Sequence, residues 1–127
     1  MPRGLARHAE EFARFRDLWA KHNRTGKPFL LANGYFCVDD NPAYARERIA
    51  EYQRHYYGAR PRASGGVASD VEWDLVGPPE AIGEAAAAYL ALGADVLVLS
   101  PSAADPRQVE ALAGPIAEHV RRARPSA

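Results

Sequence analysis

The chain contains little cysteine, little lysine and no excess of charge of either sign. Cys37 is the single cysteine of the 127 residues, so no disulfide can form within the chain. Sixteen basic residues balance sixteen acidic ones, and fourteen of the basic residues are arginine. A balanced charge does not indicate a general surface for nucleic acid or for anionic lipid. We therefore expect neither nucleic acid nor membrane among the partners.

Long apolar runs and metal-ligand spacings are missing as well. No stretch approaches the roughly 20 apolar residues of a membrane span. No apolar signal core follows Met1-Pro2-Arg3-Gly4, so a cytoplasmic location is expected. The four histidines are scattered without ligand-like spacing, and we expect no metal site: they are His8, His22, His55 and His119.

What the chain does contain is the composition of one ordinary globular domain. The hydrophobic share is 47% and the charged share is 25%. A length of 127 residues suits a single α/β domain over 1–127. A complete eight-stranded α/β barrel needs roughly 250 residues, so a whole barrel is excluded.

The C-terminal part of the chain predicts a helix, a strand and a helix. Gly77-Pro78-Pro79-Glu80 is suited to start the first helix, and Gly93 to end it. The apolar run 94–99 predicts a parallel strand covered on both faces. Asp105-Pro106-Arg107-Gln108 supplies an N-cap, a first-turn proline and a capping-box partner for the last helix. Pro115 should kink or split that helix.

The N-terminal part predicts a helix, a strand and a helix of its own. Apolar residues at helical spacing predict a helix over 5–22, and an apolar, aromatic run predicts a strand over 29–38. Asp39-Asp40-Asn41-Pro42 forms a turn and starts the second helix. Residues 59–70 have the composition of a flexible loop, and 71–76 predict a short extended segment. We expect the two main strands to lie side by side and parallel, joined by a right-handed crossover.

Three stretches carry a resemblance to a known family. They are Gly-Pro-Pro-Glu-Ala-Ile at 77–82, Leu-Gly-Ala-Asp-Val-Leu-Val-Leu at 92–99 and Asp-Pro-Arg-Gln-Val-Glu-Ala-Leu at 105–112. Over 74–121, and more loosely over 5–58, the chain resembles the tail of luciferase-like flavin-dependent monooxygenases. The resemblance implies a (β/α)8 TIM barrel and flavin mononucleotide or deazaflavin as cofactor. Because family members are complete barrels, it implies here a partial barrel, the last two strands with their helices.

Candidate site residues follow from the barrel, whose active sites lie at the C-terminal strand ends. Asp39 and Ser100 stand at those ends and are candidates for the rim of a substrate pocket. The alternative for Asp39 is a turn and cap of the next helix. Arg60 and Arg62 would hold a phosphate or carboxylate if their loop is a binding loop, and the alternative is a loop that is disordered in an isolated fragment. Trp73 is a rim candidate or a hydrophobic anchor. Catalytic and cofactor-binding residues are not identified.

Three functions stay open from the sequence. The resemblance implies the C-terminal segment of a flavin- or deazaflavin-dependent monooxygenase or oxidoreductase, inactive by itself. One alternative is a non-catalytic α/β module that self-associates or binds a partner chain, and another is a small-ligand binder that uses 59–78. A two-stranded sheet needs further cover, so we expect a homo-oligomer or a complementary barrel-forming chain. The residues expected to be poorly covered are Leu30, Phe36, Val96 and Val98.

Overall fold

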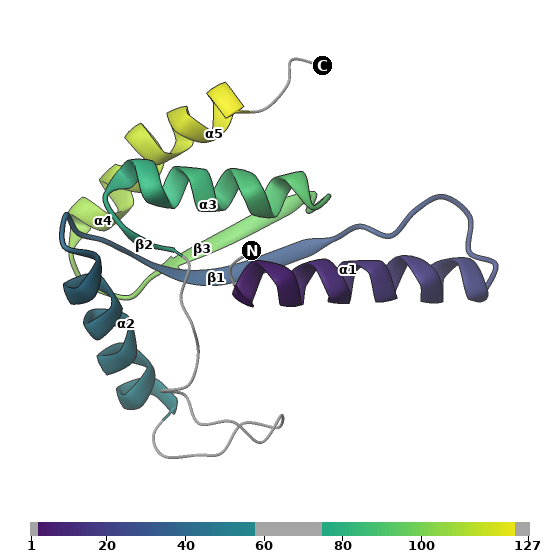
Figure 1. Cartoon of the computed structure of the whole chain (residues 1–127), viewed down its shortest axis with the longest axis horizontal. Coiled ribbons are helices and arrows are strands. Elements are labelled where there is room, and N and C mark those ends of the chain that lie inside the picture. Colours follow the sequence, from purple (N-terminus) through teal and green to yellow (C-terminus); the bar gives the residue numbers. More distant parts are fainter. Residues whose placement is uncertain (1–2, 58–74, 124–127) are drawn as a thin grey trace.

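Five α-helices, one π-helix and three strands make up the computed structural model, which describes residues 3–57 and 75–123 (Figure 1). In chain order they are α1 (Arg3–Lys21), β1 (Leu31–Val38), α2 (Pro42–Tyr57), β2 (Val76–Gly77), α3 (Pro79–Ala91), β3 (Val96–Pro101), α4 (Pro106–Ala111), the π-helix η2 (Leu112–Ile116) and α5 (Ala117–Ala123). The expected loop at 59–70 and most of the expected segment at 71–76 lie outside the described residues.

The three strands form one parallel sheet in the order β2-β1-β3. β1 and β3 pair from Leu31 opposite Val96 to Phe36 opposite Pro101, which confirms the two parallel neighbours predicted from sequence. The prediction of two strands was incomplete, because β2 pairs with the other edge of β1, where Cys37 lies opposite Val76.

Helices pack on both faces of this sheet. On one face Phe12 of α1 clusters with Ala32, and Ile82 of α3 clusters with Phe36. Side chains of a strand alternate between faces, so Cys37 points to the other face, where it clusters with residues of α2 such as Ile49. Figure 1 shows α3 and α2 on opposite sides of the strands. The sheet is therefore a middle layer.

Part of the second face has no helix over it. Val96 is 39% exposed, Val98 is 43% exposed and Leu31 is 55% exposed. Together with Asn33, which is also exposed, these residues form what we call the open face. The expectation that β3 is covered on both faces was wrong, because α2 covers the sheet only near β2 and the end of β1.

Of the four residues expected to be poorly covered, two are buried and two are exposed. Leu30 and Phe36 are buried, since α1 and α3 cover their face of the sheet. Val96 and Val98 are the two that remain exposed.

The helix ends follow the local chemistry of the sequence. The Asn41 side chain accepts from the Ala43 N–H at the start of α2, at 3.1 Å. Gly93 follows α3 with φ of 99°, a conformation that suits glycine. Pro115 lies in η2, which divides the last helical segment as predicted. Val109, in α4 before this division, is 53% exposed.

The arrangement differs from a run of consecutive barrel strands. In a (β/α)8 barrel the helices form one outer ring around the strands. Here the first strand lies in the centre and helices lie on both faces, as in doubly wound sheets. The structure is an α/β unit with a small parallel sheet, and the barrel stays a prediction.

Candidate functional site

A crevice opens where the chain leaves β1 and β3 toward opposite faces of the sheet. After β1 the chain enters α2 on one face, and after β3 it enters α4 and η2, whose Ile116 clusters with α3 on the other face. Ligands of open α/β sheets bind at such divergent carboxyl ends. The cavity has about 530 Å³ and is lined by Cys37, Val38, Asp39, Asp40, Tyr44, Arg48, Ala103, Asp105, Arg107 and Gln108.

The Gln108 side chain closes the floor of this crevice by making the hydrogen bonds that a neighbouring strand would make with β1. The Val38 N–H donates to Oε1 of Gln108 at 2.7 Å, and Nε2 of Gln108 donates to the Val38 carbonyl at 2.9 Å. Just before this point the Ser102 N–H donates to the Phe36 carbonyl at 3.0 Å. The Gln108 amide thus takes the place of the next backbone unit beside β1 and ties α4 to the end of β1.

Gln108 therefore does not serve as the capping-box partner expected from the sequence. Its side chain is buried, 6% exposed, and bonded to Val38 instead. Asp105 does cap α4, because its Oδ1 accepts from the Arg107 N–H at 3.0 Å.

Asp39 serves the turn and lines the crevice at the same time. Its Oδ1 accepts from the Asn41 N–H at 2.8 Å, which supports the interpretation as turn and cap. Its own N–H donates to the Gly77 carbonyl at 2.9 Å, so the turn is also tied to β2. The carboxylate is half-buried at the crevice wall.

Two arginines line the crevice in different electrostatic settings. Arg107 pairs with Asp105 at 2.8 Å, and this hydrogen-bonded partner lowers the pKa of the Asp105 carboxyl. Arg48 is half-buried, and its guanidinium carbon lies 5.9 Å from the centroid of the Tyr44 ring. Within residues 3–57 and 75–123, no carboxylate pairs with Arg48.

Cys37 lies at the floor of the crevice as a buried neutral thiol. It is 2% exposed, and burial raises its pKa while the charge of Arg48 opposes that rise. A raised pKa keeps the thiolate fraction low, and the thiolate is the nucleophile. Cys37 packs as a small core residue against Ala45, Ile49 and Val76.

The sequence-based candidates meet different outcomes. Asp39 lies in the crevice. Ser100 is half-buried on β3 opposite Tyr35, and it is not among the residues that line the crevice. Arg60, Arg62 and Trp73 lie outside the described residues.

Sequence reasoning missed the two side chains that shape this crevice most, Arg48 and Gln108. Arg48 follows Tyr44 by four residues on a helix, which is a spacing that brings side chains together. The residues around Gln108 indicate local capping only, whereas its partner Val38 lies 70 positions away.

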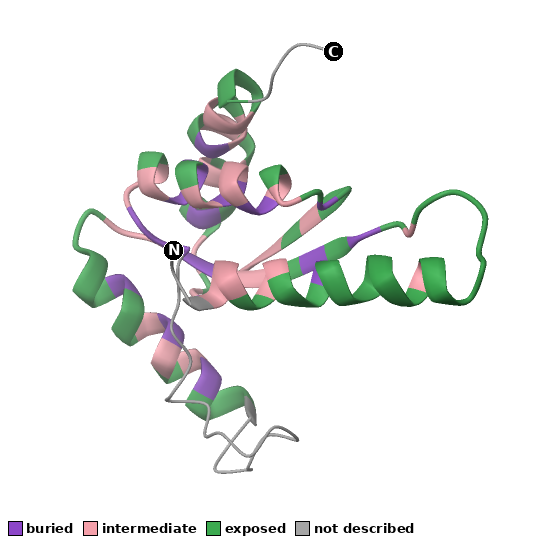
Figure 2. Ribbon diagram, turned by 45° about the vertical axis from the view of Figure 1, so that its right-hand side comes forward, coloured by how far each residue is buried: buried purple, intermediate pink, exposed green. Residues whose placement is uncertain are grey.

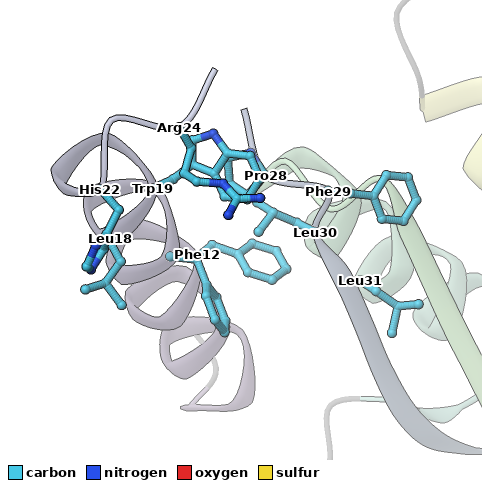
Figure 3. Close-up of a pocket in the computed structure, with 10 residues that line it drawn as sticks. Phe12, Leu18, Trp19, His22, Arg24, Pro28, Phe29, Leu30 and Leu31 are labelled. Atoms are coloured by element: carbon cyan, nitrogen blue, oxygen red, sulfur yellow. The ribbon is translucent and has the colours of Figure 1, made fainter. Parts of the chain in front are cut away.

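A second cavity, an apolar groove of about 710 Å³, lies between α1 and the chain that enters β1 (Figure 3). Phe12, Leu18 and Trp19 line it from α1, with Phe29 and Leu31 opposite. Most of the second half of α1 is exposed (Figure 2). Leu31 lines this groove and also belongs to the open face.

Within residues 3–57 and 75–123, no group of three or more His, Cys, Asp or Glu side chains is placed to hold a metal ion. No helix there has the length and apolar character to cross a membrane.

Comparisons with known proteins identify no relative of this chain. No family model matches it, and neither a curated protein nor a solved structure is significantly similar to it.

Proposed function

We propose that this chain is the C-terminal segment of a luciferase-like flavin- or deazaflavin-dependent oxidoreductase, inactive until further strands complete its site. The three stretches that resemble the family form α3, β3 with the turn before it, and α4, in the expected order. The strand among them lies parallel to β1. These features support the family by resemblance and by element order.

The observation that carries the proposal is the incomplete cover of the sheet. The open face presents Leu31, Val96 and Val98 to solvent, and Leu31 also lines the apolar groove. Apolar side chains that lie exposed side by side on a sheet favour packing against further protein. In the proposal a complementary barrel-forming chain, or a second copy, supplies the missing cover.

The crevice alone does not suit an isoalloxazine ring. Ligand pockets bury most of their ligand between largely apolar walls, whereas charged and polar side chains dominate this crevice. When bound, the flavin would supply the reaction with oxygen. Residues of this chain such as Asp39 and Arg48 would contribute only part of the rim.

One feature of the fold restricts the proposal. A complete barrel requires strands in chain order and every helix outside, whereas β2 lies beyond β1 and α2 packs on the face of Cys37. The proposal therefore requires that β2 and α2 take other positions when the remaining strands are present.

The test compares two products in a flavin titration. The chain by itself and a longer product that includes the coding region upstream of Met1 are titrated with flavin mononucleotide and with a deazaflavin cofactor, followed by fluorescence. We expect saturable binding by the longer product only. Saturable binding by the chain alone, or no front-half strands upstream and no binding by either product, contradicts the proposal.

A non-catalytic α/β module that self-associates is the second candidate. It is favoured by the strand order β2-β1-β3 with helices on both faces, which needs no barrel. This module would form oligomers through the open face yet bind no flavin in either product. The same titration therefore separates the two candidates.

A further inference from the structure

We propose that the crevice at the ends of β1 and β3 binds the anionic group of a small polar ligand, a phosphate ester or a carboxylate, and that Arg48 holds this group. The inference goes beyond the proposed function, because it concerns the crevice as the structure describes it, with α2 beside the end of β1. It concerns binding to residues of this chain and involves no chemical step.

Arg48 stands out because it is a half-buried charge without a carboxylate partner in the described part of the chain. Charges withdrawn from water are normally paired, since their desolvation is otherwise uncompensated. The next arginine on the same helix, Arg46, is exposed, as a solvated side chain should be. An oxyanion in the crevice would supply the pairing that Arg48 lacks.

The aspartates of the crevice are held by other groups. Asp105 pairs with Arg107, and an oxygen of Asp39 accepts from the Asn41 N–H. Asp40 is exposed at the rim. The carboxylates thus leave the guanidinium of Arg48 available for a ligand.

The position of Arg48 directs its charge into the crevice. Arg48 lines the crevice together with Cys37 and Asp105. Burial raises the pKa of Cys37, and the charge of Arg48 opposes that rise. The guanidinium carbon of Arg48 lies 5.9 Å from the centroid of the Tyr44 ring. A guanidinium offers a planar fork of donors that fits the oxygens of phosphate or carboxylate.

The size of the crevice indicates an organic ligand rather than a bare ion. About 530 Å³ falls within the range of small-molecule pockets. An anion on Arg48 would leave the remaining space beside Asp39 and Asp40, whose oxygens accept from hydroxyl or amino groups.

The experiment titrates the full chain with three probes: inorganic phosphate, glycerol 3-phosphate and acetate. Binding is followed by calorimetry and by NMR shifts of the Val38 and Tyr44 amides, which border the crevice. We expect saturable binding of at least one probe. Tighter binding of the two phosphates than of acetate would identify the anionic group of the ligand as a phosphate ester. Tighter binding of acetate would identify it as a carboxylate.

Two variants of the same helix provide the comparison. Arg48→Gln should weaken binding about tenfold or more, because a charge-assisted hydrogen bond is lost. Arg46→Gln should bind within about twofold of wild type, since that side chain lies outside the crevice. If Arg48→Gln does not fold, Arg48→Lys keeps the charge, loses the fork and should still bind more weakly.

Binding of none of the probes by the wild-type chain would overturn the inference, as would equal binding by the Arg48 and Arg46 variants. Because no flavin is present in these titrations, their outcome is separate from that of the flavin test. If the crevice binds phosphate while the longer product binds no flavin, the proposed function is refuted and this inference stands.

Discussion

At the scale of single residues, the side chain of Gln108 replaces a neighbouring strand as hydrogen-bond partner of the Val38 backbone. β3 ends at Pro101, while β1 continues to Val38 and still needs partners for its last N–H and carbonyl. A primary amide carries one acceptor and two donors, so Gln108 satisfies both groups of Val38. Buried backbone groups must find such partners, which makes Gln108 a determinant of the crevice floor.

Replacing Gln108 should therefore destabilise the chain and loosen the crevice. Gln108→Ala leaves two buried backbone groups without partners, at a cost of about 2 kcal/mol or more. Gln108→Glu keeps the acceptor for the Val38 N–H but places an oxygen against its carbonyl. Its penalty should shrink at acid pH, where the protonated carboxyl can donate again. Urea unfolding measures both effects.

A neighbouring residue gives the matched comparison for Gln108. Val109→Ala lies on the same helix and is exposed, so its effect should stay within about 0.5 kcal/mol. Hydrogen exchange at the Val38 amide should become faster in Gln108→Ala only. Equal stability of the Gln108 and Val109 variants would show that the two hydrogen bonds contribute nothing.

Asp105 gives a pH dependence whose sign follows from its environment. The hydrogen bonds from Arg107 lower its folded pKa below the ordinary value of 3.8. Its contribution to stability is present above 3.8 and is lost as the pH falls through the folded pKa. Urea midpoints from neutral pH down to below 3.8 should decline less in Asp105→Asn, which keeps a capping oxygen without titrating. Parallel pH profiles of the two proteins would contradict this assignment.

At the scale of helices and strands, the sequence predicts most boundaries because local chemistry sets them. Asn41, Asp105 and Gly93 act within a turn or two of their own position. Sequence reasoning failed where the partner is distant. β2 has only two residues, and its pairing with Cys37 depends on the whole crossover through α2. No periodic pattern of residues can be recognised in so short a strand.

Two glycines of the C-terminal half should respond oppositely to the same substitution. Gly93 has φ of 99°, and a Cβ there would also collide with Arg16, which donates to the Leu92 carbonyl. Gly93→Ala should cost about 1–3 kcal/mol. Gly114 lies in η2 with open space around its Cβ position. Gly114→Ala should stabilise the chain by about 0.5–1 kcal/mol, since glycine is unfavourable within a helix.

Thermal and urea unfolding of the two glycine variants measure this difference. A neutral Gly93→Ala would mean that the end of α3 does not need its left-handed conformation. A destabilising Gly114→Ala would mean that η2 requires the freedom of glycine to accommodate Pro115.

At the scale of the whole molecule, the place of the candidate site was partly predictable from the sequence. Which faces of the sheet the helices cover was not. The rule that sites lie at strand carboxyl ends pointed to Asp39, which lines the crevice in the structure, and its role in a site stays a prediction. The apolar run of β3 does not indicate that only one of its faces is covered. A parallel strand covered on one face and one covered on both can have the same apolar sequence pattern. Whether apolar residues become core depends on which elements reach them, and α2 covers only the part of the sheet near β2.

The open face leads to a prediction about assembly. Val96 and Val98 are exposed on β3, whose outer edge pairs with no strand of the described residues, and unpaired edges promote association. We expect the purified chain to self-associate at concentrations on the order of micromolar, where moderate interfaces begin to hold. Sedimentation velocity over a concentration series measures this.

A charge on the open face should abolish that association without unfolding the chain. Val98→Asp adds a carboxylate at a position 43% exposed, where it stays hydrated in the single chain but would be desolvated in an interface. Val109→Asp adds the same charge to an exposed position on α4, outside the open face, and should leave association unchanged. A wild-type chain that stays monomeric at every concentration would contradict the prediction. It would mean that the three strands and their helices are sufficient and that the exposed valines need no partner.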